Sequence, residues 1–165
     1  MECLLRLRQE QGIIERPLLV WEPAPLGCDS ADRASHLEAC NLVDVFSPNH
    51  LELGYLFEGK GEAEPTFSRE IIEAQARIFL DSGIGRDREG LVVIRSGEHG
   101  VLYLSKTKAE WLPPYYDQGC NKVVDPTGAG NAILGAVTVS LQENQRSTAS
   151  LYMWLCRGQL CYKTV

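Results

Sequence analysis

The turn Gly128–Ala129–Gly130 is the segment whose residue types point most directly to chemistry. It follows a short apolar run at 122–124 and opens an apolar stretch that extends to about Leu141. Small residues at a strand-to-helix turn let backbone N–H groups point at an anion, and the helix dipole adds a partial positive charge. A plain turn, in which glycine serves backbone geometry alone, uses the same residue types. The sequence therefore predicts a phosphate-binding turn, with an ordinary turn as the alternative.

Two standard nucleotide-binding patterns are not met. The segment Gly54–Gly61 nearly matches the P-loop pattern G-x-x-x-x-G-K-[ST], but glycine stands where the pattern needs the hydroxyl that binds magnesium. That segment also follows a predicted helix and carries bulky residues, whereas a P-loop follows a strand. The dinucleotide pattern G-x-G-x-x-G fails at Ile133. Neither a P-loop nor a dinucleotide site is therefore assigned.

Two polar turns follow other apolar runs. Asn49 comes directly after the run 42–46 and its Ser-Pro turn, and Glu52 lies three residues further on. These two residues suit a helix cap and a solvated carboxylate as well as a ligand site. The segment Ser96–Gly100 separates two apolar runs, and an ordinary hairpin turn is its simplest interpretation. Both turns are candidates because ligand sites of α/β proteins form at strand ends.

Alternating strand and helix patterns must position these turns. We expect strands at 17–21, 42–46, 91–94, 101–104 and 122–124, with the fourth returning antiparallel to the third. We expect helices at about 2–11, 29–40, 50–57, 66–83 and 129–141, and a further one after Ser147. This βαβ spacing predicts an α/β fold with a largely parallel sheet, in one domain spanning 1–165.

The composition favours a globular protein with small-molecule partners. The net charge of -6, with Lys and Arg scattered along the chain, disfavours nucleic acid as a partner. No apolar stretch approaches the roughly 20 residues that cross a bilayer, so no membrane partner is expected. The six cysteines form no C-x-x-C pair and are expected to be reduced thiols. We expect a cytoplasmic protein, and the sequence does not separate cytosol from nucleus.

Three motifs together resemble the ribokinase/PfkB family of sugar kinases. Asp125–Asn131 resembles the family signature D-T-x-G-A-G-D, and Pro48–Glu52 resembles its P-N-x-x-E motif. Arg95–Gly100 resembles its T-x-G-x-x-G turn on the nucleotide side. The motifs occur in the family's order, and the resemblance covers roughly residues 15–145. It is closest to a fungal branch that includes a protein linked to virus maintenance.

The resemblance implies a ribokinase-like three-layer sandwich and ATP-dependent phosphoryl transfer to a sugar-type hydroxyl. Gly128, Ala129 and Gly130 would form the anion hole, and ATP with Mg²⁺ would be the cofactors. The resemblance places Glu52 with Asn49 near the magnesium ion. It assigns the remaining nucleotide-side positions to Ser96, Gly97, Gly100, Asp125 and Thr127.

Two departures from the family pattern bear on activity. The last signature residue, an aspartate that accepts the hydroxyl proton, is Asn131 here. A neutral amide cannot take that proton near pH 7, so we expect impaired turnover. The family's N-terminal half is missing, and residues 151–165 form an atypical tail. We therefore weigh an impaired kinase against a non-catalytic nucleotide-binding scaffold and a truncated or misframed gene product.

Overall fold

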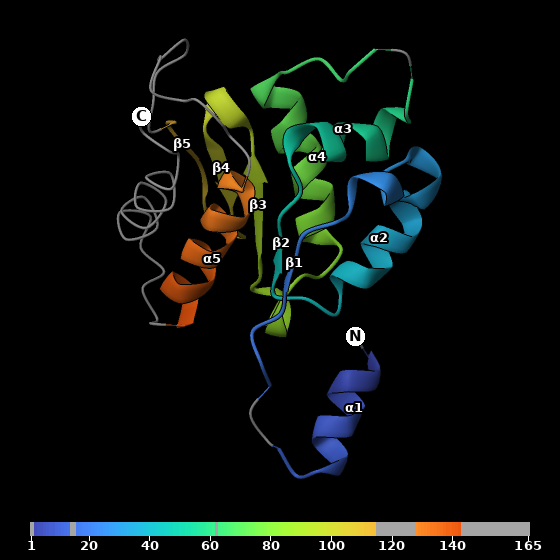
Figure 1. The fold of residues 1–165 in the computed structure, drawn as a ribbon, viewed down its shortest axis with the longest axis vertical. Coiled ribbons are helices and arrows are strands. Elements are labelled where there is room, and N and C mark those ends of the chain that lie inside the picture. The colour runs from blue at the N-terminus through green and yellow to red at the C-terminus, as the bar shows by residue number, and fades with distance from the viewer. Residues whose placement is uncertain (1, 14–15, 62, 115–127, 143–165) are drawn as a thin grey trace.

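The computed structural model describes residues 2–13, 16–61, 63–114 and 128–142 and shows a three-layer α/β arrangement (Figure 1). The sheet has the order β1 (Val20–Trp21), β2 (Val45–Phe46), β3 (Leu91–Arg95), β4 (Val101–Leu104) and β5 (Ala109–Leu112). The α-helices are α1 (Glu2–Glu10), α2 (Arg33–Cys40), α3 (His50–Glu58), α4 (Arg69–Asp81) and α5 (Ala129–Gln142). Short 3-10 turns lie at Pro25–Gly27, Ser30–Asp32, Arg86–Arg88 and Gly97–His99. None of the helices in these ranges is long and apolar enough to cross a membrane.

The sheet is open and mixed. β1, β2 and β3 pair in parallel, whereas β3, β4 and β5 pair antiparallel. The predicted α/β class and the β3–β4 hairpin are therefore confirmed, and the parallel part is the first three strands. β5 was not predicted. The strand expected at 122–124 and the helix expected after Ser147 lie outside the described residues.

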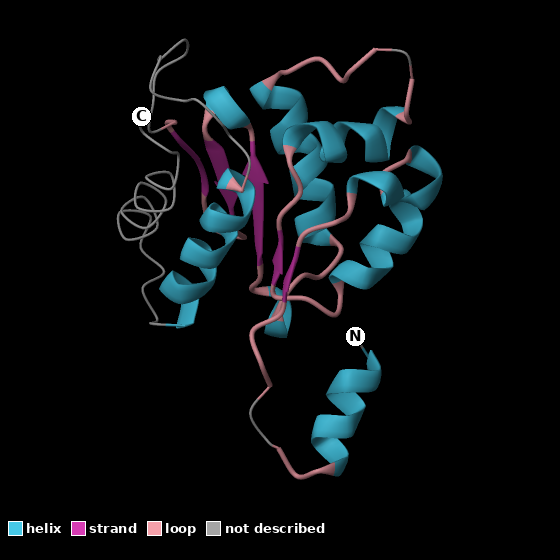
Figure 2. Cartoon of the chain, viewed as in Figure 1, coloured by secondary structure: helices cyan, strands magenta, loops and turns pink. Residues whose placement is uncertain are grey.

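Helices cover both faces of the sheet, as Figure 2 shows. On one face, α2, α3 and α4 pack with the strands around Phe46 and Phe79, whose rings lie 4.7 Å apart. On the other face, Ile133 and Val137 of α5 pack against the sheet. β3 serves both cores because successive side chains of a strand point to opposite faces. Its Val92 and Ile94 face the first core, and Leu91 and Val93 face the second.

The described cysteines are thiols. Cys28 and Cys40 are buried, and Cys3 is exposed. Burial raises the pKa of Cys28 to about 11 and that of Cys40 to about 12. Both buried thiols therefore stay protonated at neutral pH, as the core role expected for them requires.

The fold gathers the candidate turns at one edge of the sheet. The carboxyl ends of β1, β2 and β3 meet there because the three strands run parallel. Asn49 extends this pairing with an isolated parallel bridge to Arg95. α5 begins at the same edge and runs back along the sheet (Figure 1). This is the edge at which α/β folds place their ligands.

Candidate functional site

The start of α5 forms an open turn. Gly128 has a φ of 85°, in the left-handed region that favours glycine. Ala132 donates the first hydrogen bond of the helix to the Gly128 carbonyl, at 3.0 Å. The N–H groups before Ala132 therefore lack a partner within the described helix. Gly128 and Asn131 are exposed, and the two residues between them are half-buried. The turn is thus accessible to an anion from solvent.

The Arg95 guanidinium joins the ends of the three parallel strands. Arg95 is the last residue of β3 and is only 9% exposed. Its Nη2 lies 2.6 Å from Glu22 Oε1 and donates to the Ser47 carbonyl at 3.0 Å. The same nitrogen is 3.6 Å from Glu52 Oε2. One cation thus connects residues that directly follow β1 and β2 with the first turn of α3.

Arg95 also touches the start of α5. A Cβ added to Gly130 would overlap Nη1 of Arg95. An alanine at this position would therefore force the guanidinium to shift away from the first turn of α5. This contact brings the predicted anion turn and the predicted Glu52 site together on one side chain.

Asn49 and Glu52 form a reciprocal helix cap. Glu52 N–H donates to Asn49 Oδ1 at 2.8 Å, and Asn49 N–H donates to Glu52 Oε2 at 2.7 Å. This capping box starts α3. Glu52 is only 4% exposed, so the cap interpretation is confirmed and the solvated carboxylate is wrong. Desolvation raises the pKa of Glu52, against the opposing effects of the Asn49 N–H and Arg95.

The side chains that could bind magnesium at this edge would have to leave their present partners. Mg²⁺ takes octahedral oxygen coordination, usually from one or two carboxylates and several waters. Glu22 and Glu52 are the carboxylates at this edge, and Nη2 of Arg95 already contacts both. Asn49 Oδ1 is occupied by the cap, and the described residues hold no group of three or more His, Cys, Asp or Glu suited to a metal ion. Asp125 lies outside the described residues.

The predicted nucleotide-side turn follows Arg95 directly. Ser96 N–H donates to the Gly100 carbonyl at 2.8 Å, and Gly100 N–H donates to the Gly97 carbonyl at 3.1 Å. Gly97 is exposed, whereas Ser96 and Gly100 are buried. The Ser96 hydroxyl has no hydrogen-bond partner within the described ranges. The structure thus places these three residues beside Asn49 and Glu52, while Thr127 lies outside those ranges.

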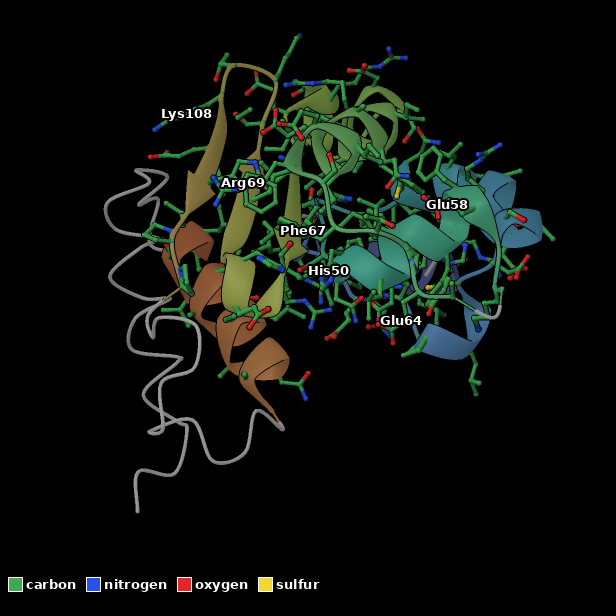
Figure 3. All side chains as sticks on the ribbon, turned by 90° about the horizontal axis from the view of Figure 1, so that it is seen from above. His50, Glu58, Glu64, Phe67, Arg69 and Lys108 are labelled. Atoms are coloured by element: carbon green, nitrogen blue, oxygen red, sulfur yellow. The ribbon has the colours of Figure 1, made fainter. Side chains whose placement is uncertain are left out.

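Aromatic rings border this turn. His99 stacks on Phe67 with ring centroids 3.7 Å apart, and His50 lies 5.8 Å from Phe67. Figure 3 shows His50 and Phe67 side by side. Burial lowers the pKa of His50 below its ordinary value, which keeps the ring neutral at physiological pH. The border of the site is therefore aromatic.

Most of the chain, including the site residues described above, matches one known protein family. The model of the pfkB family carbohydrate kinases matches residues 22–153, which is most of the chain. The chain belongs to the pfkB family of carbohydrate kinases. It is 32% identical over 145 residues to Protein MAK32 of Saccharomyces cerevisiae, covering 83% of this chain and 38% of that protein. It is 31% identical over 134 residues to an uncharacterized protein of Schizosaccharomyces pombe, covering 73% and 36%.

Solved kinases of this type share the fold. Ribokinase from Thermotoga maritima has a TM-score of 0.60 at 22% identity, covering 90% of this chain and 43% of that chain. Ribokinase from Cryptococcus neoformans in complex with ADP has a TM-score of 0.62 at 22% identity, covering 88% and 47%. The predicted family and ribokinase-like fold are confirmed, and the chain spans less than two fifths of the length of the curated relatives above.

Two residues of this pfkB site were not among the predicted site residues. Glu22 follows the parallel strand β1 and Arg95 ends the parallel strand β3, and that position was the available signal. Arg95 stands where the T-x-G-x-x-G motif of the family has threonine. A buried arginine is costly unless acceptors surround it, so its presence at this edge marks a site that the motif alone does not describe.

Proposed function

We propose that this pfkB-family chain binds the phosphates of ATP at the start of α5. The observation that carries the proposal is the open turn Gly128–Gly130, whose N–H groups have no partner within the described helix. The turn lies at the sheet edge where β1, β2 and β3 end, through the contact of Gly130 with Arg95. Helix dipole and backbone donors together favour an anion at this place.

The remaining site residues receive supporting roles. Ser96, Gly97 and Gly100 line the nucleotide side of the same edge, and the Asp125–Thr127 segment shapes the loop before α5. Asn49 and Glu52 hold the start of α3 and the Arg95 guanidinium in place, rather than binding magnesium directly. A ribokinase neighbour solved with ADP supports the nucleotide as ligand.

The same site would support slow phosphoryl transfer to a sugar-type hydroxyl. Asn131 is exposed in the first turn of α5, where it can donate to or accept from a hydroxyl. Its amide cannot accept the proton that the hydroxyl loses, so only positioning and charge stabilisation remain. General-base help is worth about 10²–10⁴-fold in rate.

A non-catalytic nucleotide-binding scaffold is the second candidate. Asn131 favours it, as does Glu52, whose carboxylate is already engaged by the cap and by Arg95. The third interpretation, a truncated product without selected activity, predicts no ligand at this turn.

Isothermal titration calorimetry tests the proposed ligand. The full 165-residue chain is titrated with ATP, with and without Mg²⁺, and with adenosine as the matched ligand without phosphates. We expect ATP to bind and adenosine to bind at least about tenfold more weakly, because the turn recognises phosphate. No binding of ATP in either buffer, or equal binding of adenosine, would contradict the proposal.

A transfer assay separates the enzyme from the scaffold. The chain is compared with its Asn131→Asp variant, using ATP and a panel of sugars. An impaired kinase gains about 10²–10⁴-fold in rate on Asn131→Asp. Equal rates for the two proteins would show that the missing base does not limit the transfer rate. If neither protein transferred phosphate, the non-catalytic scaffold would be the remaining candidate.

A further inference from the structure

Arg95 is a buried cation of the described site, and the proposed function leaves its chemical role open. Its Nη2 contacts Glu22, the Ser47 carbonyl and Glu52, while its Nη1 lies against Gly130. Its Nε–H is buried and has no hydrogen-bond partner within the described ranges. A donor of this kind favours an additional acceptor.

The negative charges of Glu22 and Glu52 already have favourable partners. Glu22 faces Nη2 at 2.6 Å. Glu52 accepts the Asn49 N–H in the first turn of α3, where the helix dipole also favours negative charge. Nη1 of the guanidinium lies against the start of α5, where it adds positive charge, reduced by the ion pair with Glu22, to the partial charge of the helix.

We propose that Arg95 is the fixed cation of this phosphate site, so that the chain binds a polyphosphate without a divalent metal ion. The inference rests on the proposed function, because it places the polyphosphate at the same turn. A guanidinium held by Glu22 and the Ser47 carbonyl is pre-organised, so little conformational freedom is lost when the anion arrives. The ligand class is the triphosphate chain of a nucleotide or inorganic tripolyphosphate.

The first test compares binding with and without a metal ion. The full chain is titrated with ATP and with inorganic tripolyphosphate, in excess Mg²⁺ and in excess EDTA. We expect the Kd of each to differ by less than about threefold between the two buffers, since the protein supplies the cation. Binding that weakens by about tenfold or more in EDTA would overturn the role of Arg95. The proposed function would still stand after that result, because ATP would bind in Mg²⁺. A failure of ATP to bind in both buffers would contradict the proposed function itself.

The second test removes the guanidinium. Arg95→Met is expected to bind tripolyphosphate at least about tenfold more weakly in EDTA, with Arg95→Lys in between because it keeps the charge but loses the planar fork. Unchanged binding by Arg95→Met would overturn the proposal.

A third variant keeps Arg95 and the fold. Glu22→Gln removes the negative charge beside Nη2, while the amide oxygen can still accept from Nη2 and hold the guanidinium in place, so it is expected to tighten tripolyphosphate binding in EDTA by about threefold or more. The matched control is Glu89→Gln, which removes an exposed carboxylate at the opposite end of β3 from Arg95 and should leave Kd unchanged. An arginine that only held the strand ends would give weaker or equal binding in Glu22→Gln, and that result would also overturn the proposal.

Discussion

Asn131 lies exposed in the first turn of α5, which makes its side chain sensitive to the helix dipole as well as to any substrate. A carboxylate at this end of a helix is stabilising, typically by about 0.3–1 kcal/mol at low ionic strength. The amide found here lacks that stabilisation, and under the proposed function it also lacks a catalytic base. The two consequences of the same replacement can be measured independently.

We expect Asn131→Asp to raise the free energy of unfolding by about 0.3–1 kcal/mol in urea titrations at low salt and pH 7. The matched control is Gln142→Glu, which makes the same amide-to-carboxylate change at the other end of α5. That control should lower the stability, because the helix dipole has the opposite sign there. Equal effects of the two substitutions would show that the dipole does not act on this turn.

Glu52 is expected to make the free energy of unfolding depend on pH. Desolvation raises its pKa above the ordinary value of 4.5, so the folded chain holds the proton more tightly than the unfolded chain. The stabilisation from a raised pKa is present below the unfolded value and is lost as pH rises through the folded value. We therefore expect the wild-type protein to gain stability relative to Glu52→Gln as pH falls from neutral toward 4.5.

Chemical denaturation across this pH range measures the difference. Glutamine also completes a capping box, so Glu52→Gln keeps the start of α3 and isolates the charge. A difference that stays flat, or that grows as pH rises, would mean that Arg95 rather than desolvation dominates the environment of this carboxylate.

The helices of this chain were predictable where local chemistry sets their ends. Ser68 caps α4 through the Ile71 N–H, within the helix expected over 66–83. β5 was missed because its burial is uneven, with Ala109 exposed and Leu112 buried, so it lacks the apolar run of β3 and β4. It is fixed instead by pairing with β4, a long-range contact that no local pattern contains.

At the scale of elements, substitutions of Asn49 measure how much its cap stabilises α3. Asn49→Ala should lower the free energy of unfolding by about 1 kcal/mol, whereas Asn49→Ser should retain most of it because serine caps equally well. Thermal and urea denaturation of both variants measure the difference. If Asn49→Ser were as destabilised as Asn49→Ala, the amide would have a role beyond the cap seen here.

For the whole molecule, the sequence indicates the family and the edge of the sheet, but not how the site is linked. The three motifs are local, and each lies where its strand ends. The link through Arg95 depends on four segments that meet only in the folded sheet, at Glu22, Ser47, Glu52 and Gly130. A single buried arginine leaves no repeating pattern in the sequence. The positions of the motifs were therefore predictable, whereas the contacts through which Arg95 links them were not.

The central claim is that the first turn of α5 receives the phosphates of ATP, and two glycines of that helix test it most directly. Gly130 lies against Arg95, while a Cβ at the exposed Gly135 would meet nothing within 4 Å. Calorimetric titration with ATP should show binding weakened by about tenfold or more in Gly130→Ala and unchanged in Gly135→Ala, which should itself be more stable by about 0.5–1 kcal/mol. Equal ATP affinity of the wild-type chain and Gly130→Ala would contradict the claim.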